Sequence, residues 1–359
     1  MNTLCMESGF VSLNKQGEDL CGDFFTTVSD DDATTFVLSD GMGSGVKANI
    51  LATLTAKILA TMTANHLSIR DSVTTLAQTL PVCSVRKLAY STFTLMQVLP
   101  DWQVYLAQFD NPQAILLRDG KSVEYPTQEL MVGDKRILES RLTLQSGDVF
   151  LLMTDGVTHA GLGNLIPDGW QREGVLQYVE EIYTPDLSAK NLATRVADAC
   201  RDLYLERIDD DVTVAVFKMR TRQAVNLLVG PPRQQKDDEA FMHQFFASEG
   251  THIVCGGSTA QMVSRYLGRQ LIISEDYVDP DIPPVAKIRG IDLVTEGIVT
   301  LSRVLEMADR YASSQSIPSH WDTRSDAATQ IARVLLEDAT DIHFFVGRAV
   351  NPSHQSPSL

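Results

Sequence analysis

The chain has 359 residues, of which 44% are hydrophobic and 21% are charged. This composition excludes a largely disordered protein, and the length suits about two domains. The 46 acidic and 30 basic residues give a net charge of −16, which disfavours nucleic acid and anionic membranes as partners.

The five cysteines form no Cys-x-x-Cys pair, so neither a disulfide scaffold nor a zinc site is expected. No apolar run approaches the roughly 20 residues of a membrane span, and the N-terminal segment does not resemble a signal peptide. The sequence therefore predicts a soluble protein of the cytoplasm.

Strands and helices are predicted over the first two thirds of the chain. A short apolar strand at 36–38 runs into Ser39-Asp40-Gly41-Met42-Gly43-Ser44-Gly45, and apolar residues then recur with helical period between residues 50 and 62. A second helix is predicted over 84–99. The later predicted strands are 104–109, 114–118, 149–153 and 212–217, and the later helices are 174–182 and 188–206. Because 149–153 is continuously apolar, we expect both of its faces to be covered.

A second alternation follows a polar segment at 218–223. Its predicted strands are 225–229, 251–255, 271–273 and 342–346, and its predicted helices are 237–247, a segment ending at 267, 292–311 and 325–337. This order predicts a small α/β domain over 224–350, for which a regulatory role is one hypothesis, followed by a flexible tail over 351–359. Gly256-Gly257-Ser258-Thr259 is typical either of an anion site at a helix N-terminus or of a tight turn in which Ser258 or Thr259 is the N-cap.

Three aspartates occupy similar positions next to predicted strands. Asp40 and Asp155 each follow a strand and precede a glycine, and Asp210 comes just before the strand at 212–217. An antiparallel sheet can bring such strand ends to one edge, where gathered carboxylates repel one another unless cations lie between them. Hard oxygen ligands favour Mg²⁺ or Mn²⁺ over zinc. Each Asp-Gly taken alone is usually a turn, but the three together favour a metal site.

Four motifs in a fixed order resemble a known family. They are Cys21-Gly22-Asp23, Ser39-Asp40-Gly41-Met42-Gly43-Ser44-Gly45, Thr154-Asp155-Gly156-Val157 and Asp210-Asp211-Val212-Thr213. They are similar to those of the metal-dependent protein phosphatases of type 2C, the PPM family, and in particular of its SpoIIE-like bacterial branch. The resemblance covers about residues 10–218 and assigns 1–220 to a phosphatase domain. It implies an α+β fold, a four-layer αββα sandwich of two antiparallel sheets, with two Mn²⁺ or Mg²⁺ ions at one end.

The resemblance also implies metal ligands, among which Asp40, Asp155 and Asp210 are the expected catalytic residues. Asp40 would bridge both ions, and the Gly41 carbonyl would help to bind the first. Asp155 and Asp210 would hold the second ion, and Asp23 would act through a water or a weaker contact.

Two neighbours of these ligands have roles that the resemblance fixes less firmly. The family pattern Asp-(Asp/Asn)-x-(Thr/Ser) favours Asp210 over Asp211 as the ligand, with Asp211 turning the chain or accepting a backbone hydrogen bond. Thr213 would support the loop.

No arginine precedes Arg70, so the phosphate-binding arginine of eukaryotic members has no counterpart here. His159 is either a general acid for the leaving group or an exposed loop histidine.

The function that the resemblance implies is hydrolysis of phosphoserine or phosphothreonine on a regulatory protein, such as a phosphorylated anti-sigma antagonist. A water shared by two divalent ions becomes a hydroxide near neutral pH and attacks phosphorus in line. The alternative is a catalytically silent phosphatase-fold module that binds a partner or ligand through its C-terminal domain. A small-molecule phosphohydrolase is a third hypothesis, and a dimer is compatible with any of them.

Overall fold

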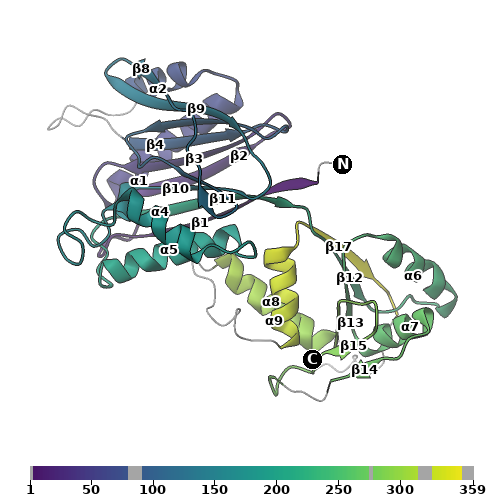
Figure 1. Cartoon of the computed structure of the whole chain (residues 1–359). Coiled ribbons are helices and arrows are strands. Elements are labelled where there is room, and N and C mark those ends of the chain that lie inside the picture. The colour runs from purple at the N-terminus through teal and green to yellow at the C-terminus, as the bar shows by residue number, and fades with distance from the viewer. Residues whose placement is uncertain (1–2, 80–90, 275–277, 314–325, 350–359) are drawn as a thin grey trace. The chain divides into compact units, whose positions relative to one another are not determined.

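The computed structural model describes residues 3–79, 91–274, 278–313 and 326–349 (Figure 1). The chain divides into two compact units: Leu4–Arg220, and Thr221–Leu359 together with Met1–Thr3. None of the helices in the described ranges combines the length and the apolar character needed to cross a membrane.

The unit Leu4–Arg220 contains two sheets whose described pairings are antiparallel. The first has the order β1-β11-β10-β6-β7, with bounds Leu4–Leu13, Val212–Thr221, Asp148–Met153, Ile115–Arg118 and Lys121–Ser122. The second has the order β2-β3-β4-β5-β9-β8, with bounds Asp23–Ser29, Thr34–Gly41, Ser91–Val98, Gln103–Phe109, Lys135–Thr143 and Gln128–Val132.

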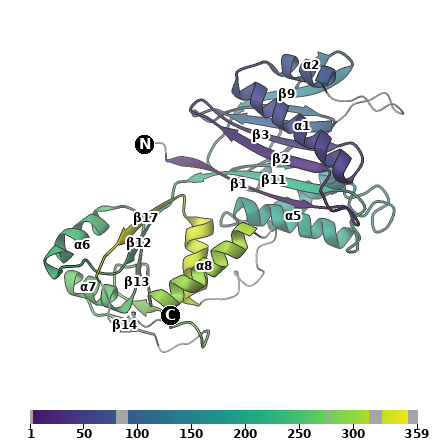
Figure 2. The ribbon, with the colours of Figure 1, turned by 180° about the vertical axis from the view of Figure 1, so that it is seen from behind.

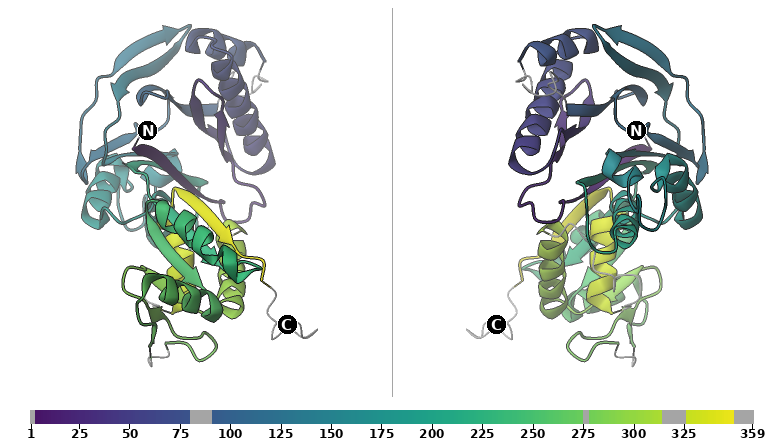
Figure 3. Two further views of the ribbon diagram at one scale, coloured as in Figure 1. Left: turned by 90° about the vertical axis from the view of Figure 1, so that its right-hand side faces the viewer. Right: turned by 90° about the vertical axis from the view of Figure 1, so that its left-hand side faces the viewer.

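Helices cover the outer face of each sheet, as Figures 1, 2 and 3 show. Helices α1 (Gly45–Ala64) and α2 (Ile69–Thr79) pack on the second sheet, and α4 (Gln171–Ile182) and α5 (Ala189–Leu203) pack on the first. The inner faces of the two sheets meet in one core, in which the ring centroids of Phe36 and Phe217 lie 4.4 Å apart. The predicted αββα sandwich is therefore confirmed.

The strands at the centre of the sandwich are buried on both faces. In β10, Phe150 and Leu152 face the core between the sheets, whereas Leu151 and Met153 face the core beneath α4 and α5. The alternation follows from the two-residue period of a strand. It explains why 149–153 carries no polar residue, as the sequence predicted.

The predicted helix over 84–99 is wrong over its second half. Ser91–Val98 forms β4, which pairs with β3 and β5, and residues 84–90 lie outside the described residues. Phe93 and Leu95 of β4 pack under the helices, while Met96 and Val98 face the other sheet. Pairing on both sides thus outweighs the helical spacing of the apolar residues. Strands β1, β2, β8 and β9 and helix α2 were not predicted.

The C-terminal unit is a separate α/β fold. Its sheet has the order β14-β15-β16-β13-β12-β17, in which β16, β13, β12 and β17 are parallel. The strand bounds are Ile272–Ile273, Ala286–Lys287, Leu293–Thr295, Thr251–Cys255, Ala224–Val229 and Asp341–Val346. Helices α6 (Asp238–Ala247) and α7 (Gly257–Leu267) contribute to one core, and α8 (Ile298–Ser313) and α9 (Ala327–Arg333) to the other, on the two faces of the sheet.

Two local predictions for the C-terminal unit are wrong. The helix expected over 292–311 begins with strand β16 and turns helical only at Ile298, because 293–295 pairs with β13. The N-cap of α7 is Gly256, with φ of 109°, rather than Ser258 or Thr259. The Thr259 hydroxyl instead accepts a hydrogen bond from Gly230 N at 3.0 Å. The predicted tail over 351–359 lies outside the described residues.

Candidate metal centre

One edge of the second sheet brings Asp23 and Asp40 together. In the register of β2 and β3, Asp23 lies opposite Asp40, and Thr92 of β4 lies opposite Asp40 on its other side. Gly41 ends β3, and a Cβ at this position would lie 2.0 Å from the carbonyl oxygen of Ala48. Glycine therefore lets α1 begin close behind the strand end.

The matching edge of the first sheet carries Asp155 and Asp210. Asp155 opens the short helix α3 (Asp155–Thr158) just after β10, and Asp210 precedes β11, which pairs antiparallel with β10. A Cβ at Gly156 would lie 2.0 Å from the carbonyl oxygen of Asp211. The absence of a side chain at position 156 therefore lets α3 lie directly against the loop that carries Asp210.

The two edges border a common cavity of about 300 Å³. It is lined by Asp40, Met42, Gly43, Thr92, Asp110, Asp155 and Asp210. The three aspartates expected to be catalytic are thus brought to one place from three strand ends, those of β3, β10 and β11. Sequence reasoning missed Thr92 and Asp110, which reach the cavity only through the pairing of β3, β4 and β5.

Asp23 is 4% exposed and is not among the residues that line this cavity. Its Oδ2 accepts a hydrogen bond from Thr154 Oγ1 at 2.8 Å, whereas its Oδ1 is buried without a hydrogen-bond partner among the described residues. An unpartnered buried carboxylate oxygen is costly unless a cation compensates for it. The donor set therefore fits a cation site.

Each of these carboxylates makes ionisation of its neighbours less favourable, which raises their pKa values. Burial, the charges of Asp23 and Asp155 and a hydrogen bond to Asp155 raise the pKa of Asp40 to about 9. Burial, with smaller contributions from Asp211 and Asp155, raises the pKa of Asp23 to about 7. Burial and the charge of Asp155 also raise the pKa of Asp210. Carboxylates gathered in this way make ionisation of one another less favourable, and a divalent cation between them would favour the ionised forms.

The neighbours Asp210 and Asp211 have different surroundings. Asp210 lines the cavity, whereas Asp211 is buried and accepts a hydrogen bond from Lys15 N at 3.0 Å through Oδ1. Its Oδ2 is buried without a partner among the described residues. Thr213 N donates to Thr154 Oγ1 at 2.9 Å, which links the start of β11 to the end of β10. The choice of Asp210 as the ligand stays a prediction that this arrangement favours.

His159 lies beside the aspartates rather than in a remote loop. Its Nδ1 is 3.8 Å from Asp155 Oδ2, and each of these two side chains is a little under half exposed. Potential ligand atoms of Asp155, His159 and Asp210 all lie within 4.8 Å of one another. The sequence pointed to His159 because it closely follows Asp155, and helix α3 places the two residues one helical turn apart.

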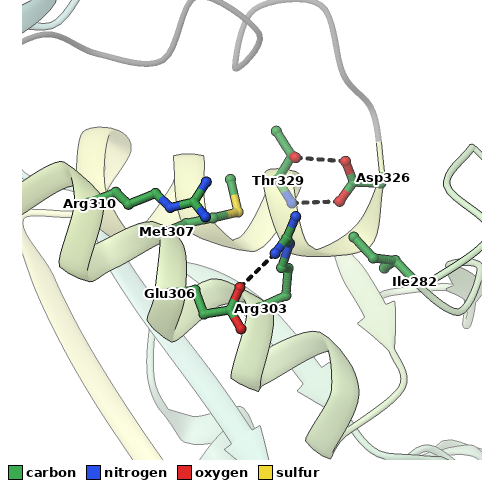
Figure 4. Close-up of a pocket in the computed structure, with 7 residues that line it drawn as sticks. All are labelled: Ile282, Arg303, Glu306, Met307, Arg310, Asp326 and Thr329. Atoms are coloured by element: carbon green, nitrogen blue, oxygen red, sulfur yellow. Dashed lines mark hydrogen bonds and ion pairs between the residues drawn. The ribbon is translucent and has the colours of Figure 1, made fainter.

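A second pocket lies in the C-terminal unit, between α8 and α9 (Figure 4). Its polar side chains contact one another. Arg303 pairs with Glu306, and Asp326 accepts hydrogen bonds from Thr329 N and Oγ1, which caps α9. The first contact lies within α8 and the second caps the N-terminus of α9, and we assign the pocket no ligand.

The sandwich and its acidic edge define a protein of the PP2C phosphatase fold. A family model for stage II sporulation protein E (SpoIIE) matches residues 30–220, and the chain belongs to this family. No match was found among curated proteins.

Among the solved structures that share the fold, two illustrate the similarity. The PP2C phosphatase domain of SpoIIE from Bacillus subtilis, with a fragment of its regulatory domain, has a TM-score of 0.52 and 19% identity. That match covers 61% of this chain and 63% of the Bacillus chain. The RsbU and RsbW domains of Rv1364c from Mycobacterium tuberculosis have a TM-score of 0.50 and 16% identity, covering 68% and 70% of the two chains. Identities this low establish the fold alone.

Proposed function

We propose that this protein is a metal-dependent protein serine/threonine phosphatase that acts on a regulatory phosphoprotein. The observation that carries the proposal is the shared cavity of Asp40, Asp155 and Asp210, backed by the buried and unpartnered oxygen of Asp23. Such a set of carboxylates has no structural use without cations, because each disfavours the charge of the next.

The proposed ligands of two Mn²⁺ or Mg²⁺ ions are Asp40, Asp155, Asp210, the Gly41 carbonyl and, more weakly, Asp23. Bound there, the ions would lower the pKa of a water to give a hydroxide nucleophile and offset charge on the phosphoryl group. Asp40 lines the cavity from β3, while Asp155 and Asp210 line it from the ends of β10 and β11 in the other sheet. The Thr154 hydroxyl donates a hydrogen bond to Asp23 and thereby helps to orient this carboxylate, which lies opposite Asp40 in the sheet.

The walls of the cavity also bear on substrate binding. Its described lining contains carboxylates, Met42, Gly43 and Thr92, and no arginine or lysine. The cations would therefore carry most of the attraction for a phosphate, which makes the site unsuited to binding phosphate without them. We propose a phosphorylated anti-sigma antagonist as the class of substrate, and regulation of the phosphatase unit as the role of the C-terminal unit.

Hydrolysis of p-nitrophenyl phosphate by the full chain tests the proposal. Activity should require Mn²⁺ or Mg²⁺ and should fall by roughly 10³-fold or more in Asp40→Asn, because the cations would lose one of their proposed carboxylate ligands. Asp101→Asn, in the exposed turn between β4 and β5, is the matched control and should retain activity.

Stabilisation by metal without turnover would contradict the enzyme and support the silent binding module. Faster hydrolysis of sugar phosphates than of a phosphoserine peptide would contradict the protein substrate and leave the metal chemistry standing.

A further inference from the structure

The cluster Asp155, His159 and Asp210 contains one side chain that the proposed ligand set does not use. His159 Nδ1 lies 3.8 Å from Asp155 Oδ2, and all three groups offer ligand atoms within 4.8 Å of one another. Two ligand atoms on opposite sides of one ion, each about 2.1 Å from it, lie about 4.2 Å apart, and adjacent ligands lie closer. The cluster is therefore close to the size of a single coordination sphere.

The backbone of α3 sets the spacing of this cluster. His159 N donates to the Asp155 carbonyl at 2.8 Å, which places the two residues one helical turn apart. Side chains at this separation lie on the same face of a helix. Asp155 and His159 therefore point to the same side without any rearrangement of the backbone.

The turn that carries His159 is held by two further contacts. Tyr204 Oη donates to the Gly156 carbonyl at 2.8 Å. On the other side the chain passes so close that a Cβ at Gly169 would lie 2.8 Å from the carbonyl oxygen of Thr158. The backbone that carries the imidazole is therefore held in place, as a precise metal site requires. Its partial exposure leaves space for an ion and its waters.

We infer that His159 is a third protein ligand of the ion held by Asp155 and Asp210. An imidazole nitrogen suits first-row transition ions, whereas Mg²⁺ takes oxygen ligands almost exclusively. This position is then an Asp-His-Asp site that prefers Mn²⁺ to Mg²⁺. The inference rests on the proposed function, since it concerns one of the two ions proposed there.

Pulsed electron paramagnetic resonance of bound Mn²⁺ tests the inference without an activity assay. The full chain, freed of metal with a chelator, is titrated with Mn²⁺ alone up to two equivalents. Nitrogen coupling from a coordinated imidazole should appear in the wild type and vanish in His159→Gln. The same variant should raise the Kd for Mn²⁺ by roughly tenfold or more, with a much smaller change for Mg²⁺.

Two variants complete the design. His66 also pairs with an aspartate, with Nε2 3.6 Å from Asp32 Oδ2, but this exposed pair lies outside the cluster. His66→Gln should therefore keep the nitrogen coupling. His159→Glu, which replaces nitrogen by oxygen, should bind Mg²⁺ at least as well as the wild type and show no coupling.

The possible outcomes separate the inference from the proposed function. Mn²⁺ that binds without nitrogen coupling, or with coupling that persists in His159→Gln, overturns the inference and leaves the phosphatase proposal standing. A chain that binds no Mn²⁺ overturns both.

Discussion

Asp23 is a buried carboxylate of which only one oxygen has a partner. Thr154 satisfies Oδ2, and Oδ1 has no hydrogen-bond donor among the described residues. Asp40 lies opposite Asp23 in the sheet, and the negative charges of the two ionised carboxylates repel each other. Without cations, these two side chains oppose folding whenever they are ionised.

The pH dependence of the metal-free protein should reveal this repulsion. The pKa values of Asp23 and Asp40 in the folded state, about 7 and about 9, lie above the unfolded value of roughly 3.9. Their contribution to stability is therefore full below pH of about 4 and is lost as the pH rises through these folded-state values. Urea unfolding in EDTA should give a free energy of unfolding that falls by on the order of a few kcal/mol between pH 5 and pH 9.

Two controls accompany this measurement. Asp40→Asn should flatten the profile, because it removes the group with the higher pKa and relieves its neighbour. Saturating Mn²⁺ should flatten it as well. Equal stability of the metal-free wild type at both ends of the range would rule out the repulsion.

The sequence identifies the site residues that belong to motifs, and it misses Thr92 and Asp110, which belong to none. Asp40, Asp155 and Asp210 each adjoin a glycine or a strand end, and all three reach the cavity. Asp110 and Thr92 carry no such signal, because only strand register brings them there. Register depends on contacts between distant segments, which no local pattern contains.

Among the elements, α3 packs against the loop before β11 because position 156 has no side chain. Gly156→Ala would place a Cβ 2.0 Å from the Asp211 carbonyl oxygen, so α3 and the loop before β11 must separate. We expect a loss of roughly 1–3 kcal/mol in the free energy of unfolding. Calorimetry should also show weaker Mn²⁺ binding, because Asp155 moves away from Asp210.

Gly257→Ala is the matched control for this variant. Gly257 begins α7, and a Cβ there would meet no atom within 4 Å. This substitution should leave the stability and the Mn²⁺ affinity nearly unchanged. A Gly156→Ala protein that behaves like this control would contradict the close packing of α3 on the Asp211 loop.

A helix or strand is predicted correctly when its own residues show a clear pattern. Strand β10 was predicted because its burial on both faces produces an unbroken apolar run. The helix predicted over 84–99 differs from strand β4, because pairing with β3 and β5 decides the structure of this segment. Strand β16 has only three residues and was merged with the helix that follows it. Short elements carry too few positions for a period to be recognised.

For the whole molecule, the main fact is that two units have separate cores. The SpoIIE match ends at residue 220, and the C-terminal sheet and its helices lie beyond it. The proposed ligands all belong to the first unit. We therefore expect cations to stabilise the unit Leu4–Arg220 and to leave the stability of the C-terminal unit unchanged.

Thermal unfolding followed by calorimetry should resolve this difference as two transitions. Mn²⁺ at about 100 times its Kd should stabilise one of them by about 2.7 kcal/mol and leave the other in place. Asp40→Asn should abolish the shift of the first transition and leave the second as it was. A single transition that moves as a whole would contradict independent cores.

The proposed ligands are spread along most of the first unit, from Asp23 near its beginning to Asp210 near its end. On the ribosome, the nascent chain therefore cannot assemble the complete site until nearly all of that unit has emerged. A truncated translation product would carry most of the sandwich and yet lack one of the carboxylates. If the proposed function holds, truncated copies of this protein should consequently lack phosphatase activity.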